Sequence, residues 1–247
     1  MLLQAALKGD LTKAAHRAVP VSAEELARDA VACVAAGARA IHLHPRDAGG
    51  RERLDPQIVD AVVGEVQVTC GVPVGVSTGA WIEPDLDRRL AMVGGWRRPD
   101  YASVNVSESG AAEIALALID VGVGVEAGVW TVEDVDRLAT WPARDRLTRI
   151  LVEPVDASPT GAVALVDAIH AALDRAGLDA PRLQHGDGAA TWILLDDAVR
   201  RGMDTRVGLE DALCEPSGGR TSGNAALVGV AAASGAGEAT SPRPPSS

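Results

Sequence analysis

Short apolar runs alternate along the chain with longer segments in which apolar residues recur every three or four positions. The short runs fit strands buried in a parallel sheet, and the longer segments fit amphipathic helices that cover it. The predicted strands span residues 2–7, 38–44, 73–77, 101–105, 124–126, 149–152, 182–185 and 204–207. The predicted helices span residues 22–37, 56–70, 85–93, 111–121, 132–140, 160–176, 190–201 and 224–233.

Local signals mark the starts of the first two predicted helices. Ser22-Ala23-Glu24-Glu25 has the form of a capping box, in which the serine and the second glutamate satisfy backbone amides at the helix start. Asp55-Pro56 places an N-cap residue before proline at the first helical position. Both signals support the boundaries that the apolar pattern indicates.

Eight strands that alternate with eight helices predict a TIM (β/α)8 barrel, because eight parallel strands close into a barrel. A doubly wound open sheet is the alternative. The barrel is expected to occupy residues 1–233 as a single domain. The tail over residues 234–247 is rich in Gly, Ser and Pro and is expected to be disordered.

Composition narrows the classes of protein. The chain has 247 residues, 47% of them hydrophobic, with no Phe and one Tyr, so Ala, Val and Leu must fill the core. A net charge of -11 argues against binding nucleic acid or an anionic membrane. Three cysteines without C-x-x-C spacing favour neither disulfides nor a thiolate metal site, and a reducing cytoplasm fits best. The apolar run at the N-terminus is too short for a secretory signal, and no run reaches the length of a membrane span.

Polar residues collect where the predicted strands end. In a barrel of this kind the loops that follow the strands build the active site. The opposite strand ends carry small or apolar residues, and this asymmetry indicates an enzyme. The polar residues are Lys8, His42, His44, Ser77, Thr78, Asn105, Ser107, Glu126, Glu153, His185, Asp187, Arg206, Glu210 and Asp211.

His42 and His44 are the first candidate metal ligands. Side chains two apart on a strand point to the same side, so the two imidazoles can ligate one metal ion. Two histidines that only hydrogen-bond polar neighbours are the alternative. Glu210 and Asp211 are both candidates for a third ligand, and the one that does not bind metal can face the reacting carbon. Arg206 is near enough to hold that second carboxylate, unless the group is an ordinary surface ion pair.

These residues together resemble the β-keto acid cleavage enzymes, whose named member is the 3-keto-5-aminohexanoate cleavage enzyme. The resemblance runs from Leu3 to about Val230 and is most specific in His42-Leu43-His44-Pro45-Arg46-Asp47 and in Arg206-Val207-Gly208-Leu209-Glu210-Asp211. Residues 5–9, 20–25, 76–79 and 224–228 support it.

The resemblance implies a zinc-dependent barrel, commonly a homotetramer, that converts a β-keto acid and acetyl-CoA into acetoacetate and a new acyl-CoA. It implies that His42, His44 and Glu210 hold one zinc ion, and that Asp211, supported by Arg206, is the base. Ser77 would contact the substrate carboxylate. The pocket is further expected to use Thr78, Asn105, Ser107 and Glu126, and the phosphates of CoA would need Lys8, Lys13, Arg17, Arg46 or Arg51.

Two other functions stay open at this point. A metal-dependent hydrolase of the amidohydrolase type also uses His-x-His in a barrel, but it needs further histidines, for which His185 is the convincing candidate. A non-catalytic barrel that binds a small acid or a metal is the other alternative.

Overall fold

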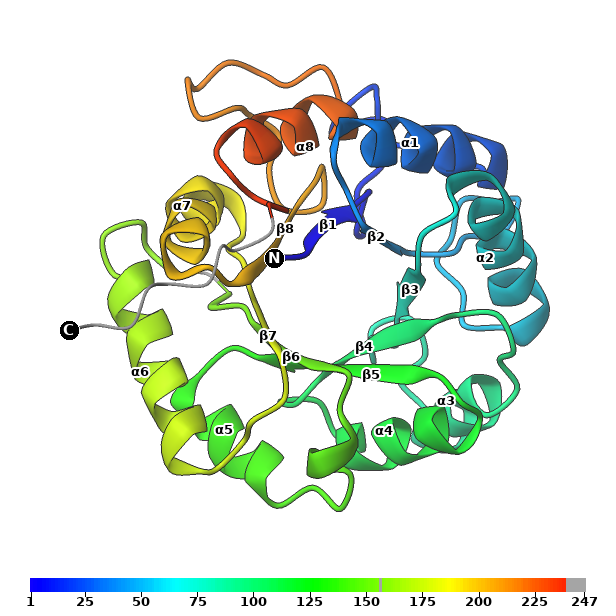
Figure 1. The fold of residues 1–247 in the computed structure, drawn as a ribbon. Helices are drawn as coiled ribbons and strands as arrows, with labels where there is room; N and C mark the ends of the chain where they lie inside the picture. The colour runs from blue at the N-terminus through cyan, green and yellow to red at the C-terminus, as the bar shows by residue number, and fades with distance from the viewer. Residues whose placement is uncertain (156, 239–247) are drawn as a thin grey trace.

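The structure is a computed structural model that describes residues 1–155 and 157–238. Eight parallel strands pair in sequence order and close into a barrel, and helices form a ring around it (Figure 1). The strands are β1 (Leu3–Ala6), β2 (Ala40–Leu43), β3 (Val74–Ser77), β4 (Tyr101–Asn105), β5 (Gly124–Val129), β6 (Arg149–Val152), β7 (Arg182–Gln184) and β8 (Asp204–Val207). The helices are α1 (Ala23–Ala36), α2 (Pro56–Cys70), α3 (Leu86–Val93), α4 (Ala111–Asp120), α5 (Val132–Ala139), α6 (Ala162–Arg175), α7 (Thr191–Arg201) and α8 (Asn224–Ala233).

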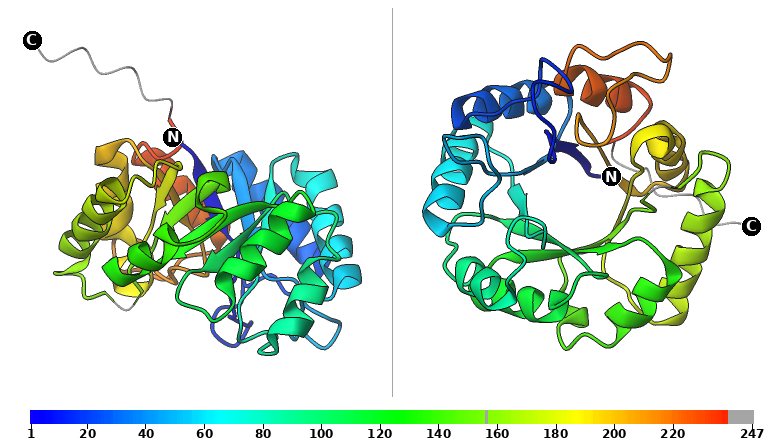
Figure 2. Two further views of the ribbon diagram at one scale, coloured as in Figure 1. Left: turned by 90° about the horizontal axis from the view of Figure 1, so that it is seen from below. Right: turned by 180° about the vertical axis from the view of Figure 1, so that it is seen from behind.

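The closed sheet confirms the TIM (β/α)8 barrel and excludes the open sheet. The barrel closes because β1 pairs with both β2 and β8, which brings the first and last strands together. Views from below and from behind show the helices as the outer layer, with α1 and α8 side by side (Figure 2). The C-terminal ends of all eight strands therefore lie around one mouth of the barrel, as the predicted site at the strand ends requires.

The element boundaries differ most at β5. The strand was predicted to end at Glu126, but it continues to Val129. Gly128 pairs in register with Asn105 on β4 and Leu151 on β6. Small residues such as Ala127 and Gly128 carry little strand propensity, so this extension depends on tertiary pairing that the local sequence does not signal.

The two helix-start signals have different outcomes. The predicted capping box forms, since Ser22 Oγ accepts from Glu25 N and the Glu25 carboxylate accepts from Ser22 N. Asp55 is the N-cap residue of α2 as predicted, but its side chain makes no capping hydrogen bond. Its carboxylate lies 3.6 Å from Arg53 Nε instead.

A polar layer fills the barrel nearer the N-terminal strand ends. Gln4 Nε2 donates to Glu126 Oε1 at 3.1 Å, and Arg149 Nε lies 3.0 Å from the same oxygen. The Tyr101 hydroxyl donates to Ile41 O at 2.6 Å. Burial raises the pKa of Glu126 to about 7, although Arg149 opposes the shift. These contacts engage the Glu126 carboxylate inside the barrel.

The residues just after α8 pack against the barrel. Ala236 is buried, and the N-terminal amine of Met1 donates to Glu238 O at 3.1 Å. Residues 234–238 are thus held in place, which differs from the disorder expected for them. The remainder of the predicted tail, residues 239–247, lies outside the described residues. Within the described chain, the structure has no helix of the length and apolarity that a membrane crossing requires.

Candidate metal and substrate site

His42 ends up inside the mouth of the barrel because β2 alternates its side chains. His42 lies in β2 and His44 follows the strand, and both are nearly fully buried. Their ring centroids are 5.3 Å apart, with the planes at 81° to each other. The predicted placement of both imidazoles on one side of the strand is therefore what the structure has.

Glu210 reaches these histidines from the loop after β8, and two glycines permit its approach. A Cβ on Gly208 would lie 1.8 Å from the carbonyl oxygen of Ala6, so only glycine lets this loop press against β1. Gly9 has φ +52° and donates its amide to Glu210 Oε2 at 2.9 Å. The Asn224 side chain joins the same two loops, because it accepts a hydrogen bond from Leu209 N at 2.6 Å and donates one to Leu7 O at 2.7 Å.

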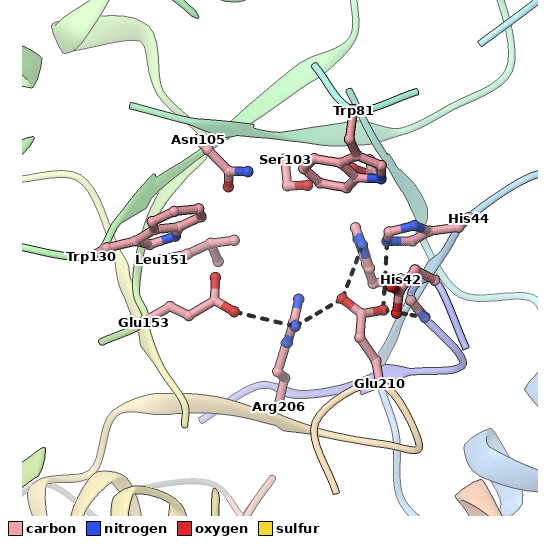
Figure 3. Close-up of a pocket in the computed structure, with 13 residues that line it drawn as sticks. His42, His44, Trp81, Ser103, Asn105, Trp130, Leu151, Glu153, Arg206 and Glu210 are labelled. Atoms are coloured by element: carbon pink, nitrogen blue, oxygen red, sulfur yellow. Dashed lines mark hydrogen bonds and ion pairs between the residues drawn. The ribbon is translucent and has the colours of Figure 1, made fainter. Parts of the chain in front are cut away.

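The three side chains converge in a way that fits one metal ion (Figure 3). Their ligand atoms all lie within 4.8 Å of one another. His42 Nε2 is 3.8 Å from Glu210 Oε1, and His44 Nε2 is 3.7 Å from Glu210 Oε2. Ligand atoms about 2.1 Å from one tetrahedral zinc ion would be roughly 3.4 Å apart, so small side-chain shifts suffice. Two imidazoles and one carboxylate also match the ligand chemistry of catalytic zinc sites, which keep a position open.

The ionisable side chains of this cluster shift one another's pKa values. Burial lowers the pKa of His42 to about 3 against the opposing effect of Glu210. Burial also acts to lower the pKa of His44, but Glu210 and Glu52 outweigh it and raise that pKa to about 9. Burial acts to raise the pKa of Glu210, yet Arg206 and the two histidines hold it well below its usual range. Glu210 is therefore ionised and available as a ligand.

Arg206 connects Glu210 to its neighbour Asp211. Its Nη2 lies 2.7 Å from Asp211 Oδ1 and 3.0 Å from Glu210 Oε1. Within the described part of the chain, the other oxygen of Asp211, Oδ2, is buried and has no hydrogen-bond partner. Burial raises the pKa of Asp211 to about 6, with Arg206 opposing the shift. The predicted Arg206 contact is thus present, and one carboxylate oxygen stays free to accept a proton.

His42, His44, Arg206 and Glu210 face a cavity of about 290 Å³ at the barrel mouth (Figure 3). Asp211 lies beside Arg206 and is not among the residues of the cavity wall. The residues of its wall come from seven of the eight strands and the loops that follow them. They are Gly9, Asp10, His42, His44, Ser77, Trp81, Ser103, Asn105, Trp130, Leu151, Glu153, Arg206 and Glu210.

The predicted substrate residues divide into two groups. Ser77 and Asn105 line the cavity. Thr78 is buried and donates its hydroxyl to Ser103 O at 2.7 Å, while Ser107 is exposed in the turn after β4. Like Glu126, neither of these two lines the cavity. Substrate contacts by Thr78, Ser107 and Glu126 therefore have no support from the cavity wall.

Several wall residues were not predicted as site residues. Ser103 could have been found, because it lies two positions before Asn105 and so points to the same side of β4. Trp81 and Trp130 were not predicted as part of the wall. No local sequence pattern predicts Trp81 as a wall residue. Its place depends on the fold of the loop, in which the indole lies over Gly79, where an added Cβ would be 2.3 Å from the ring.

Lys8 does not lie where a CoA phosphate could reach it. Its side chain is completely buried, and burial, with the nearby charge of Arg46, lowers its pKa to about 7. Of the other cations expected to meet phosphates, Lys13 forms an ion pair with Glu25, and Arg51 forms one with Asp47.

With this geometry established, the comparison with known families is decisive. A family model described as beta-keto acid cleavage enzyme matches residues 1–241. The chain belongs to the beta-keto acid cleavage enzyme family. This match confirms the resemblance to the family, and it favours an enzyme over the non-catalytic barrel, because the family is one of C–C bond-cleaving enzymes.

Solved structures agree with this beta-keto acid cleavage enzyme family member in fold. The apo structure of ObcA has a TM-score of 0.68 at 18% identity and is covered over 61% of its length by 87% of this chain. A ternary complex of ObcA with C4-CoA adduct and oxalate gives the same TM-score, with 63% of its length covered. The 3-dehydroquinate dehydratase from Geobacillus kaustophilus HTA426 has a TM-score of 0.60 at 13% identity, over 92% of this chain and 86% of its own. The present chain thus spans less than two thirds of the ObcA chains.

The hydrolase alternative needs further histidines at the metal. His185 directly follows β7 and is fully buried, but its ring nitrogens lie 3.6 Å from Glu153 Oε2 and 3.9 Å from Asp211 Oδ1. Among the described residues, the ligand group at the mouth comprises His42, His44 and Glu210 without His185. The arrangement therefore favours the family's own chemistry.

Proposed function

We propose that this protein is a zinc-dependent beta-keto acid cleavage enzyme that uses acetyl-CoA to convert a β-keto acid into acetoacetate and a new acyl-CoA. The observation that carries the proposal is the convergence of the His42, His44 and Glu210 ligand atoms within 4.8 Å in a member of this family. These three side chains would hold the ion. A bound divalent cation would supply Lewis-acid stabilisation of negative charge on the keto oxygen.

The protein's own residues would move the proton and hold the substrate. Asp211 would remove a proton from the carbon between the ketone and the carboxylate, because its Oδ2 has no hydrogen-bond partner among the described residues while Arg206 holds Oδ1. Ser77 Oγ accepts from Gly79 N at 3.2 Å, so its hydroxyl hydrogen is left to donate to the substrate carboxylate. Asn105 would line the same pocket.

The remaining steps balance without another reactant. The substrate carbanion attacks the thioester carbon of acetyl-CoA, and CoA thiolate leaves. The thiolate then attacks the original ketone carbon, and cleavage of the adjacent C–C bond releases the new acyl-CoA and the carbanion of acetoacetate, which takes back the proton that Asp211 removed. The solved complex of ObcA with a C4-CoA adduct and oxalate supports a CoA thioester and a small acid as the reactants. A homotetramer remains part of the proposal, and light scattering of the purified protein tests it.

Two substitutions test the proposed roles separately. Purified wild-type protein is expected to hold about one zinc ion per chain and to form acetoacetate from acetyl-CoA and one of a panel of β-keto acids. His42→Ala should lose both properties. Asp211→Asn should keep zinc and lose about 10²- to 10⁴-fold in turnover, the usual range for removal of a general base.

A matched control is His170→Gln, because His170 is buried in α6 and bonds Gln184 Oε1 at 2.9 Å outside the site. It should keep zinc. Stoichiometric zinc in His42→Ala protein would overturn the metal assignment, and full turnover by Asp211→Asn would overturn the choice of base.

A further inference from the structure

Glu52 lies directly behind His44, on the side of the imidazole that faces away from Glu210. Glu52 Oε1 is 3.2 Å from His44 Nδ1, while His44 Nε2 faces Glu210 Oε2 at 3.7 Å. The two ring nitrogens of His44 therefore meet one carboxylate each. The Glu52 side chain is only 12% exposed, so this contact is shielded from water.

The carboxylate is carried into this position by a small hairpin between β2 and α2. Arg46 and Glu52 form an antiparallel bridge, and Asp47 N donates to Arg51 O at 2.9 Å across the turn. Arg46 Nη2 lies 3.5 Å from Glu52 Oε1 and donates to Gly9 O at 3.2 Å. Glu52 is thus tied to the backbone of the loop after β1, which also holds Glu210 through Gly9 N.

The second oxygen of Glu52 accepts a hydrogen bond from Trp81, a residue of the cavity wall. Trp81 Nε1 donates to Glu52 Oε2 at 3.0 Å. The Trp81 ring stacks near His44, with 6.3 Å between centroids and 26° between planes, although 56% of Trp81 is exposed. The Glu52 carboxylate therefore contacts the candidate ligand His44 through one oxygen and the exposed Trp81 ring through the other.

We propose that Glu52 is a positioning residue that keeps a proton on His44 Nδ1, directs Nε2 at the metal, and fastens Trp81 over the site. This inference rests on the proposed metal site. A metal-bound histidine commonly donates its other ring N–H to a carboxylate, and loss of that partner typically weakens metal binding about 10- to 100-fold. Because Glu52 also accepts from Trp81, its loss should free the indole at the same time.

The test compares zinc affinity, the His44 ring and Trp81 in Glu52→Gln and a control. Zinc affinity is measured by chelator competition and should fall about 10- to 100-fold in Glu52→Gln. Nitrogen-15 NMR of zinc-loaded protein should show His44 protonated at Nδ1 in wild type, and a changed Nδ1–H signal in the variant. Acrylamide should quench the tryptophan fluorescence of the variant more strongly, and Trp81→Phe should remove that difference.

Asp47→Asn is the matched control, because it removes the same charge from the same hairpin without a contact to His44. It should keep the wild-type affinity and the wild-type His44 signal. Unchanged zinc affinity and an unchanged Nδ1–H signal in Glu52→Gln would overturn the inference while leaving the metal site intact. A wild-type protein that binds no zinc would instead overturn the proposed function, and the inference with it.

Discussion

At the scale of single residues, the site depends on close backbone approaches as much as on its ligands. Gly208 and Gly9 let the loops after β8 and β1 touch, and Glu210 reaches the histidines across that contact. His42 and Glu210 are 168 positions apart in the printed sequence, yet their side chains lie 3.8 Å apart. The ligand set is therefore sensitive to residues that carry no metal-binding group.

Gly208→Ala should weaken zinc binding and lower stability. Its Cβ would lie 1.8 Å from Ala6 O, a backbone atom that cannot move aside without shifting β1. Overpacking of this kind costs about 1–3 kcal/mol. Gly229→Ala is the control, because Gly229 lies within α8 and no atom of the described residues is within 4 Å of the added Cβ. This substitution should stabilise the helix by up to about 1 kcal/mol. Thermal melting and chelator competition measure both effects, and wild-type zinc affinity in Gly208→Ala would contradict this explanation.

At the scale of elements, the capping box at the start of α1 could be predicted from the sequence. Glu25 closes the capping box and also accepts from Val21 N at 2.7 Å and from Lys13 Nζ. The hydrogen bond from Lys13 is the main reason that the pKa of Glu25 is lowered to about 2, followed by the bond from Val21. Because the pKa is depressed in the folded state, the stabilisation is present above the unfolded value of 4.5 and is lost as pH falls toward 2.

Glu25→Gln is expected to melt at a lower temperature than wild type at pH 6, since glutamine keeps an acceptor but loses the charge. The difference in melting temperature should shrink between pH 4.5 and pH 2, where wild-type Glu25 takes up its proton. Glu24→Gln removes a charge from the same first turn and serves as the control. A difference that persists unchanged at pH 2 would exclude the ionised capping contact as its source.

The elements could be predicted because their signals are local, and the failures have a common physical cause. The apolar pattern located every strand and helix of the barrel, and His42, His44, Ser77 and Asn105 followed from their places at strand ends. The extension of β5 and the cavity wall of Trp81 depend on contacts between distant segments. Glu52 was missed for the same reason, since a folded hairpin brings it back to His44.

At the scale of the whole molecule, closure of the barrel is what assembles the site. β1 pairs with β2 on one side and with β8 on the other, so the loops after the second and eighth strands face each other across the first. The Asn224 side chain, at the start of α8, fixes that arrangement from behind through Leu209 N and Leu7 O. A metal ion at the mouth would therefore join the beginning and the end of the barrel.

The most direct measurement is anomalous diffraction at the zinc absorption edge from crystals of the active protein. We expect one strong peak about 2.1 Å from His42 Nε2, His44 Nε2 and a carboxylate oxygen of Glu210. The peak should be absent from crystals of His42→Ala protein. An active protein without a peak between these three side chains, or with its zinc bound elsewhere, would contradict the assignment.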